Sequence, residues 1–370
     1  MNSFLHIVCL DAPSPPDYGG AIDMYYKIEA LAKAGKKIIL HYFDYKEGRG
    51  VEGLEDHCVE INRYPRKTFS LTFLYRPYIT ASRVHTKLLR RLNADTHPIL
   101  IEGLHGAGLI RHIENSNRVV LRMHNEEVAY YAQLSGAEQN QWKRMYLRWE
   151  SKRLHAFQKH LAKDLKLAVL SETDIKVFRE EYGFTNTHFI PCFLPWQKIS
   201  GEPGTGNYCL YHGNLSVAEN EQAALWLIEQ VFMRSHLPLI VAGKGASQRL
   251  KDAAARAKKV TIVSNPSMQR LDHLIREAHI NVLPSLNSTG VKLKLLHALF
   301  DGRFVITNSN GVSGSGIRDG VAIADTAEAF IEKVNALMPQ SFSKADVEKR
   351  KDLLKLYNND SNARELMELW

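Results

Sequence analysis

The chain has 370 residues, 45% of them hydrophobic and 24% charged, with a net charge of +8; this composition excludes a largely disordered protein, and the length favours two domains over one. No apolar stretch approaches the roughly 20 residues that span a bilayer, and the first apolar run, residues 4–10, lacks the basic flank of a secretion signal. Together with four cysteines that show no CxxC spacing, these features favour a cytoplasmic protein with reduced thiols.

In the first half of the chain, apolar strand patterns alternate with helical patterns. Residues 4–10 are typical of a strand, residues 21–35 of a helix closed by Gly35, and residues 36–43 of a second strand, which together make a βαβ unit. Further strand patterns follow at residues 98–104, 118–124 and 165–171, and residues 137–161 show a helical pattern throughout. This alternation predicts a parallel sheet covered by helices on both faces.

A break in the pattern separates the two halves of the chain. Three prolines and three glycines fall within residues 189–207, where no helical period survives, and we place a linker at residues 191–207. The alternation then restarts, with strand patterns at residues 207–213, 237–243, 259–264, 280–285 and 303–308. The sequence therefore predicts an N-terminal domain at 1–195, a second doubly wound domain at 196–342 and a charged helical tail at 343–370.

Two doubly wound domains of this kind face each other across a cleft in our prediction, and ligands of open α/β sheets bind beyond the carboxyl ends of the strands. Gly19 and Gly20 lie between the first strand and its helix, where backbone amides and a helix N-terminus suit a phosphate group. A plain turn explains the same two glycines equally well. The loop is not GxGxxG, so an NAD-dependent function is not favoured.

Polar residues also follow two later strands of the first half. His105 ends one strand, and Arg122, His124 and Asn125 end the next. A histidine at such a strand end can hydrogen-bond a sugar hydroxyl or transfer a proton near neutral pH, although a single histidine is more often structural.

The loops of the second half contain more candidate ligand contacts. Gly213 and Asn214 follow its first strand, and Gly243 and Lys244 follow the second. The richest loop is residues 284–311, where Thr289 and Gly290 precede a helix and Lys292 and Lys294 lie in its first turn. Lysines there oppose the helix dipole, so an anionic ligand explains their placement better than helix stability does, with a solvated helix face as the alternative.

At this loop the sequence GVKLKLLHALFDGRFVITNSNGVSG resembles the retaining glycosyltransferases of family 4, which have the GT-B fold. The resemblance extends to PPDYGG after the first strand, RMHNEEVAYY, VLSETDIKVF and YHGNLSVAENEQAALWL. It implies that the C-terminal domain holds a nucleoside-diphosphate sugar, that the N-terminal domain holds the acceptor, that the final helix crosses back to the first domain, and that no metal ion is required.

The chain departs from the family pattern at four positions. Thr289 and His297 stand where the family has two glutamates, and Asn214 and Glu219 stand where it has an arginine and a lysine that neutralise the diphosphate. We expect Lys292 and Lys294 to replace those cations, because a leaving diphosphate needs positive charge and amide donors. A protein that binds a nucleotide sugar or a partner protein without catalysis is the alternative that the missing glutamates favour.

These observations give a set of predicted site residues. His124 and His297 are the candidate catalytic residues. The predicted diphosphate contacts are Gly19, Gly20, Gly213, Asn214, Thr289, Gly290, Val291, Lys292 and Lys294, and the predicted nucleoside contacts are Gly243, Lys244, Asn265, Pro266 and His297. His105, Arg122 and Asn125 are predicted to contact the sugar or the acceptor. The substrate is a UDP- or GDP-sugar, the acceptor is a glycan or a lipid-linked hydroxyl of a surface polysaccharide pathway, and neither a cofactor nor a metal is expected.

The basic charge of the first half is concentrated in residues 61–94, which contain eight basic residues and no acidic one. Within them Val84, Leu88 and Leu92 repeat at four-residue spacing, and Arg83, Lys87, Arg90 and Arg91 surround that stripe. Such a helix can lie on the anionic inner face of the cytoplasmic membrane, or it can pack on its own sheet with a solvated basic face. Nucleic-acid binding is not favoured, because few aromatic residues are interleaved with the basic ones.

Overall fold

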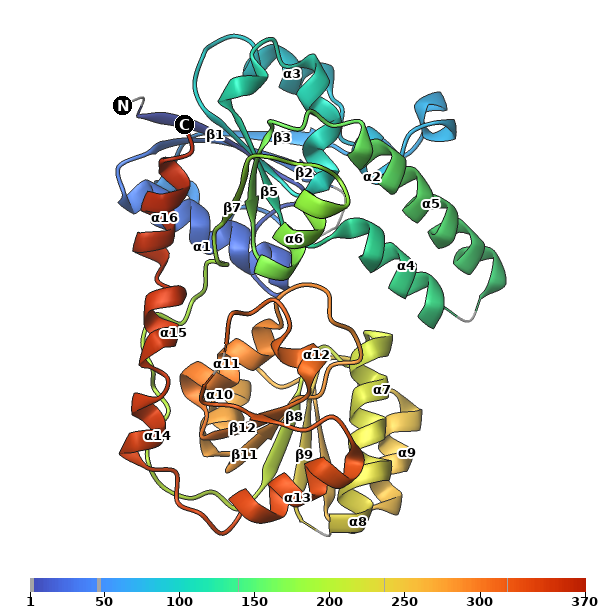
Figure 1. Cartoon of the computed structure of the whole chain (residues 1–370), viewed down its shortest axis with the longest axis vertical. Coiled ribbons are helices and arrows are strands. Elements are labelled where there is room, and N and C mark those ends of the chain that lie inside the picture. Colours follow the sequence, from blue (N-terminus) through green and yellow to red (C-terminus); the bar gives the residue numbers. More distant parts are fainter. Residues whose placement is uncertain (1–2, 45–47, 139, 236, 318) are drawn as a thin grey trace. The chain divides into compact units, whose positions relative to one another are not determined.

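A computed structural model of the chain describes residues 3–44, 48–138, 140–235, 237–317 and 319–370. The chain divides into two compact units, which Figure 1 shows with their elements labelled. Unit 1 comprises Met1–Gln197 and Tyr357–Trp370, and unit 2 comprises Lys198–Leu356. Unit 1 is therefore built from both ends of the sequence.

Unit 1 contains, within the described residues, a seven-stranded parallel sheet with the order β3-β2-β1-β4-β5-β6-β7. Strands β2 and β3 follow on one side of β1, and strands β4 to β7 follow on its other side. The strand order therefore reverses between β1 and β4, and their carboxyl ends form the topological switch point. The strands are β1 Phe4–Cys9, β2 Lys37–Asp44, β3 Cys58–Pro65, β4 Ile99–Glu102, β5 Val119–Met123, β6 Lys166–Val169 and β7 Thr187–Phe189.

Helices cover both faces of this sheet, as the nearly continuous apolar strands require. One face packs against α1 and α16, and the other against α3, η3, α5 and α6. The helical elements are α1 Gly19–Lys33, η1 Glu55–His57, η2 Leu71–Leu74, α2 Tyr78–Ala81, α3 Thr86–Leu92, η3 Leu104–His112, η4 Ser116–Arg118, α4 Glu127–Ala137, α5 Gln141–Lys159, α6 Glu172–Glu180 and α16 Asn359–Met367.

The C-terminal helix α16 is an integral part of unit 1. Ala363 and Leu366 join the buried cluster that Met24 and Ile28 of α1 form with the sheet, and Figure 1 shows α16 beside α1. Asn359 also binds the backbone of Leu194 in both directions, at 3.0 and 2.9 Å. The expected tail at 343–370 thus divides, because α14 Lys344–Glu348 and α15 Lys351–Leu356 belong to unit 2.

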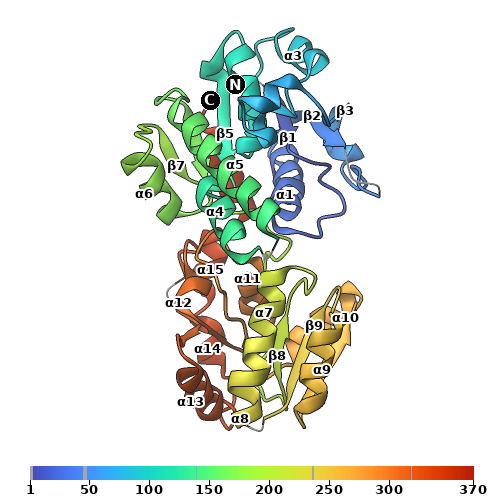
Figure 2. The same ribbon diagram turned by 90° about the vertical axis from the view of Figure 1, so that its right-hand side faces the viewer.

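Unit 2 has, in the part of the chain that is described, six parallel strands in the order β10-β9-β8-β11-β12-β13. Figures 1 and 2 show α7 and α9 on one face of this sheet and α10 and α11 on the other. The strands are β8 Cys209–His212, β9 Leu239–Gly243, β10 Val260–Ser264, β11 Ile280–Val282, β12 Phe304–Thr307 and β13 Ala322–Ile323. The helices are α7 Ala218–Trp226, η5 Leu227–Phe232, α8 Met233–Ser235, α9 Gln248–Arg256, α10 Met268–Glu277, α11 Leu293–Asp301, α12 Ser309–Val312 and α13 Ala327–Leu337.

One predicted element differs from the structure. Residues 137–161 were expected to form one helix, but α5 begins only at Gln141, because the side chain of Asn140 accepts hydrogen bonds from the amides of Trp142 and Lys143 and so caps a new helix. Residue 139 lies outside the described residues. Among the helices that the structure describes, none has the length and apolar composition needed to cross a bilayer.

Candidate functional site

A buried group of charged side chains lies under the carboxyl edge of the unit 1 sheet, close to the switch point. Lys27 of α1 donates to Asp23, one helical turn earlier, at 2.7 Å and to Glu102 at the end of β4 at 2.9 Å. Arg122 of β5 pairs with the other oxygen of Asp23 at 3.0 Å. All four side chains are buried, so two carboxylates are neutralised by two cations inside the unit.

The pairing determines the protonation states of the two acids. Burial alone would raise the pKa of Asp23, but Arg122 and Lys27 outweigh it and hold that pKa well below its usual range. Burial likewise opposes ionisation of Glu102, and Lys27 together with a hydrogen bond from His124 lowers its pKa. Both carboxyls are therefore ionised at neutral pH.

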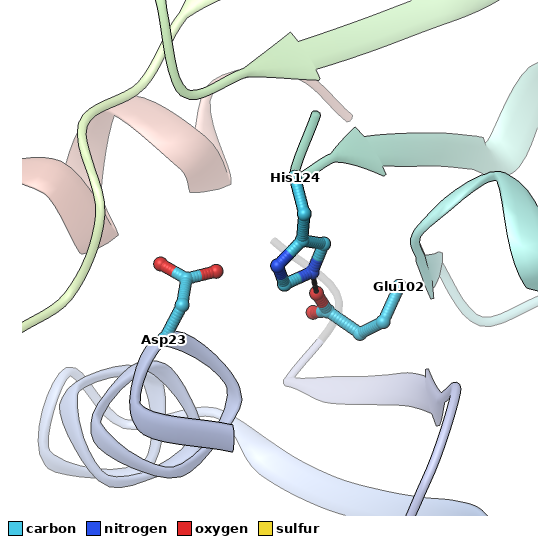
Figure 3. A group of neighbouring side chains, drawn as sticks. All are labelled: Asp23, Glu102 and His124. Atoms are coloured by element: carbon cyan, nitrogen blue, oxygen red, sulfur yellow. Dashed lines mark hydrogen bonds and ion pairs between the residues drawn. The ribbon is translucent and has the colours of Figure 1, made fainter. Parts of the chain in front are cut away.

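His124 contacts this group from the end of β5. Its Nε2 lies 2.8 Å from a carboxylate oxygen of Glu102, the contact drawn in Figure 3. Since an ionised carboxylate only accepts, Nε2 carries the proton that it donates to Glu102. A Cβ atom on Gly20 would stand 3.9 Å from Nδ1, so the first turn of α1 approaches this nitrogen closely. Glu102 thereby orients the imidazole with Nδ1 toward the β1–α1 turn.

Asp23, Glu102 and His124 also have the spacing of metal ligands, since one candidate ligand atom of each lies within 4.8 Å of the others (Figure 3). However, Lys27 and Arg122 already neutralise both carboxylates, and bringing a dication next to these two cations would cost Coulomb energy. We assign no metal to this group.

Arg122 does not fit its predicted contact with a sugar or an acceptor. Its side chain is fully buried, and besides Asp23 it donates to the carbonyl oxygens of Ile190 at 2.6 Å and Pro191 at 2.9 Å. The guanidinium thus joins β5 to α1 and to the segment after β7, which gives it a structural role.

A second polar group lies near the ends of β4 and β5. Burial and the neighbouring Glu126 raise the pKa of Glu127 to about 7, although a hydrogen bond from Asn125 and the charge of Arg83 oppose that rise. Burial, with Arg83 and His124 nearby, holds the pKa of His105 well below its usual range, so this ring is neutral. A carboxyl that titrates near neutral pH and a neutral imidazole can both exchange hydrogen bonds with a hydroxyl group.

The structure contradicts the predicted membrane contact of Arg83. This side chain is 2% exposed and donates to the carbonyl oxygens of Leu10 at 2.8 Å and Ile79 at 3.0 Å, so it fixes the start of the β1–α1 loop. Leu88 and Leu92 of α3 are fully buried in the core of unit 1. Because its apolar stripe already packs on its own sheet, α3 has no apolar face for a bilayer, although Lys87 and Arg90 are exposed. Arg91 forms ion pairs with Glu60 and Asp95.

In unit 2, Lys294 lies in the first turn of α11, against the end of β8. Its ammonium donates to Asn220 Oδ1 at 3.0 Å and to the Tyr211 hydroxyl at 3.2 Å. Within the described residues these are two acceptors for three N–H groups. Burial lowers the pKa of Lys294 to about 8, with Glu219 raising and Lys292 lowering it. The ammonium is thus positively charged at neutral pH and poorly hydrated, which strengthens its attraction for an anion.

Glu219 organises the loop that precedes α11. One oxygen accepts from the Ser285 hydroxyl at 3.1 Å, and the other accepts from the Asn287 amide. Asn287 Oδ1 in turn accepts from Lys292 at 2.5 Å, and Lys292 also donates to the carbonyl of Thr289. Gly290 has φ +66°, a backbone conformation that favours glycine, and Val291 follows it half-buried. Glu219 therefore holds the loop by hydrogen bonds, at a position where the resemblance implied a cation.

The other predicted contacts of unit 2 lie at the neighbouring strand ends. A Cβ atom on Gly243 would stand 1.8 Å from the carbonyl oxygen of Gly213, so only glycine permits this approach of β9 to the β8–α7 turn. The Asn214 side chain accepts from Ser216 within that turn, and Asn265 Oδ1 accepts from the Gly245 amide at 2.9 Å. Lys244 is exposed and Pro266 is half-buried beside them. The structure thus gathers these residues at one edge of the unit 2 sheet.

His297 lies on the inner side of α11, where it is 5% exposed. Its Nε2 lies 3.3 Å from a carboxylate oxygen of Asp272 on α10 and 3.3 Å from one of Asp301. Burial opposes protonation, but the hydrogen bonds with Asp272 and Asp301 outweigh it and raise the pKa of His297 above its usual value. This geometry joins α10 to α11; contact of His297 with a ribose, and its catalytic role, stay predictions.

The raised pKa of His297 has a consequence for stability. Its protonated form is favoured in the folded state, so the stabilisation is fully present below the unfolded value of about 6.5 and is lost as the pH rises through the higher folded value. We expect the melting temperature of wild type to fall relative to that of His297→Gln between about pH 6 and pH 8. Melting temperatures are measured by circular dichroism at each pH. If the melting temperatures of wild type and His297→Gln change with pH by the same amount, the raised pKa of His297 is wrong.

Comparison with known proteins shows what unit 2 is similar to. Residues 206–340 match the family model of group 1 glycosyl transferases. This stretch includes every residue that we predicted in unit 2, from Gly213 to His297. An uncharacterised 44.6 kDa protein in the cps region of Klebsiella pneumoniae is 26% identical over 354 residues, which are 89% of this chain and 89% of that one.

Solved structures resemble the chain along nearly its full length. Sucrose-phosphate synthase from Thermosynechococcus elongatus matches with a TM-score of 0.71 at 16% identity, covering 99% of this chain and 98% of that one. The lipopolysaccharide outer core galactosyltransferase WaaB, in its apo form, gives 0.66 at 13% identity, with coverages of 98% and 99%. Anabaena HepE in complex with UDP and glucose gives 0.65 at 10% identity, with coverages of 99% and 98%. The predicted fold class, two doubly wound units of the GT-B type, is confirmed.

Several residues of these groups were not assigned from the sequence. Asp23, Lys27 and Glu102 lie within apolar helix and strand patterns, where only the Asp–Lys spacing of one helical turn gave a signal. Asp272 comes from a different helix than His297, whereas Asp301 lies on the same helix, and no motif links the three residues.

Proposed function

We propose that the chain transfers a sugar from a UDP- or GDP-sugar to a hydroxyl group of a glycan or lipid-linked acceptor, with retention at the anomeric carbon, in building a surface polysaccharide. Lys294 supports this proposal most strongly, because a partly desolvated ammonium at a strand end of the stretch that matches group 1 glycosyl transferases is suited to a diphosphate leaving group. The cps region of the Klebsiella relative supports the polysaccharide pathway.

In this proposal unit 2 binds the donor. Lys294, Lys292 and the amides of Gly290 and Val291 hold the diphosphate, and the residues at the ends of β8, β9 and β10 hold the nucleoside. In unit 1, the side chains of His124, His105 and Asn125 bind sugar hydroxyls. Gly19 and Gly20 open α1, whose first turn contains no acidic residue, and their contact with a phosphate remains part of the proposal.

The proposal is tested by incubating the purified chain with a panel of UDP- and GDP-sugars, with and without hydroxyl acceptors, and following release of the nucleoside diphosphate. The anomeric configuration of the product is read by NMR from its coupling constant. We expect one donor to release its nucleoside diphosphate. We also expect the product to have the same anomeric configuration as that donor. Inversion of configuration would disprove the retaining mechanism.

A second candidate function is binding of a nucleotide sugar without transfer. It is favoured by the absence of a carboxylate at positions 289 and 297 and by the internal hydrogen bonds of Lys292 and Lys294. Saturable binding of a donor without any release of diphosphate would establish this alternative.

The lowered pKa of Lys294 predicts how donor binding depends on pH. Since its ammonium deprotonates near pH 8, we expect the Kd for the nucleoside diphosphate to rise as the pH increases from about 7 to about 9.5. Lys294→Arg keeps its charge over this range and should remove most of that rise. Isothermal titration calorimetry measures both variants, and an identical pH dependence in the two would refute the diphosphate contact.

A further inference from the structure

Large apolar side chains are exposed on unit 1, among the residues that the structure describes. Phe69 is 81% exposed, Leu74 73% and Trp142 80%, although each has a side chain that normally lies inside a protein. Further exposed large hydrophobic residues accompany them in two segments, the η2 segment and the α4–α5 pair: Leu71, Tyr75, Tyr130, Leu134, Met145, Tyr146 and Trp149. We call these ten residues the aromatic face.

Most of the aromatic face lines two adjoining hollows. One hollow of about 870 Å³ lies between α4 and α5, and another of about 460 Å³ lies between the η2 segment and α5. Tyr146 and Trp149 line both hollows, so they join the two segments into one surface. A contiguous apolar surface of this kind on a globular protein marks a binding site more often than a chance exposure.

Hydrogen bonds hold the two segments in register. The guanidinium of Arg153 lies 4.0 Å from the ring centre of Trp149 and donates to the carbonyl oxygens of Phe73, at 2.7 Å, and Arg76. Glu150 accepts from the amide of Tyr78. These contacts join the segment around η2 to α5 and place Trp149 beside it.

Basic side chains border the aromatic face. Helix α5 contains six basic residues and one acidic residue, and Arg148 and Lys152 are exposed at the edge of the larger hollow. A second copy of the chain would bring the same positive charge against this edge, which opposes self-association. Tryptophan and tyrosine side chains beside exposed lysines and arginines are instead the composition of a surface that lies at a bilayer interface.

We propose that the aromatic face docks unit 1 onto an anionic lipid bilayer. The apolar side chains Phe69, Leu71, Leu74 and Met145 enter the boundary of the acyl chains, Trp142, Tyr146 and Trp149 lie at the level of the headgroups, and Arg148 and Lys152 pair with lipid phosphates. This contact is separate from the proposed transfer reaction, and it replaces α3 as the surface that faces the lipid.

Flotation of the full chain with vesicles tests this docking without any sugar present. We expect binding to vesicles of phosphatidylcholine and phosphatidylglycerol in equal parts, weaker binding at high salt, and little binding to phosphatidylcholine alone. The double variant Arg148→Glu/Lys152→Glu should lower the partition coefficient at least about tenfold, and Trp142→Ser/Phe69→Ser should lower it by a similar factor. These positions are exposed, and unchanged melting curves verify that each variant folds.

The matched control is Lys87→Glu/Arg90→Glu, which makes the same change of charge on the exposed side of α3. Its partition coefficient should stay within about twofold of wild type. If both charge-reversal variants lose binding equally, net charge alone explains the binding and the proposed surface is wrong. If only the α3 variant loses binding, α3 is the surface that contacts the membrane. Tighter binding to single-stranded RNA than to vesicles, or a dimer that Trp142→Ser/Phe69→Ser dissociates, would also overturn the proposal. Donor binding is measured separately, so the two proposals fail independently.

Discussion

Replacing Lys294 by methionine is expected to lower the turnover number by about 10²–10³-fold, because the departing diphosphate loses a charged donor in a poorly hydrated place. Methionine fills a similar volume against Tyr211, so the loss of charge dominates the change. The measurement is the release of nucleoside diphosphate under saturation with the donor that wild type uses. The Kd for that donor should rise in the same variant, since the ground state also contains the diphosphate.

The control for this change is Lys251→Met on α9, which removes an exposed lysine that is not among the predicted donor contacts. We expect its turnover to match wild type. If Lys294→Met turns over donor at the wild-type rate with an unchanged Kd, the diphosphate contact is wrong. A melting curve checks that the loss of the hydrogen bonds to Tyr211 and Asn220 has not unfolded unit 2.

The second large effect is expected from Lys27→Met in unit 1. The change leaves Asp23 and Glu102 buried with Arg122 as the remaining cation of the group, and breaking a buried pair from one side costs about 3–5 kcal/mol. The free energy of unfolding of unit 1, followed by urea denaturation of the whole chain, should fall by this amount. Some of the chain is then expected to be unfolded at 37 °C.

The double variant Lys27→Met/Glu102→Gln distinguishes an uncompensated charge from a lost contact. It removes one charge of each sign, leaving Asp23 paired with Arg122, so we expect it to be more stable than Lys27→Met alone. If the double variant is instead less stable than the single one, the charge balance of this group is not what stabilises unit 1.

The fold was largely predictable because parallel strands buried on both faces produce unmistakable apolar runs. The runs at residues 4–10 and 118–124 became β1 and β5. Strand β3 escaped prediction because its residues alternate between exposed and half-buried at the edge of the sheet, and β7 and β13 are too short to give a periodic signal. The capping role of Asn140 was equally invisible within a charged helical pattern.

The candidate site was predictable only in part. Strand-end glycines, together with Lys294, could be located because loop chemistry follows the ends of parallel strands. The sequence could not reveal that Arg122 and Arg83 are buried, since an arginine in a strand or a turn can face either a ligand or a backbone carbonyl. The partners of His297 come from another helix, so only the folded chain shows that two aspartates raise its pKa.

The assignment of α16 to unit 1 affects how the protein is made. Unit 2 is a continuous segment, and it can fold as soon as Leu356 has left the ribosome. Unit 1 has most of its residues synthesised before unit 2, yet α1 keeps part of its apolar side uncovered until Ala363 and Leu366 arrive. During translation the earlier half is therefore the last to complete its core, and nascent chains stalled before residue 357 should be the ones that recruit chaperones.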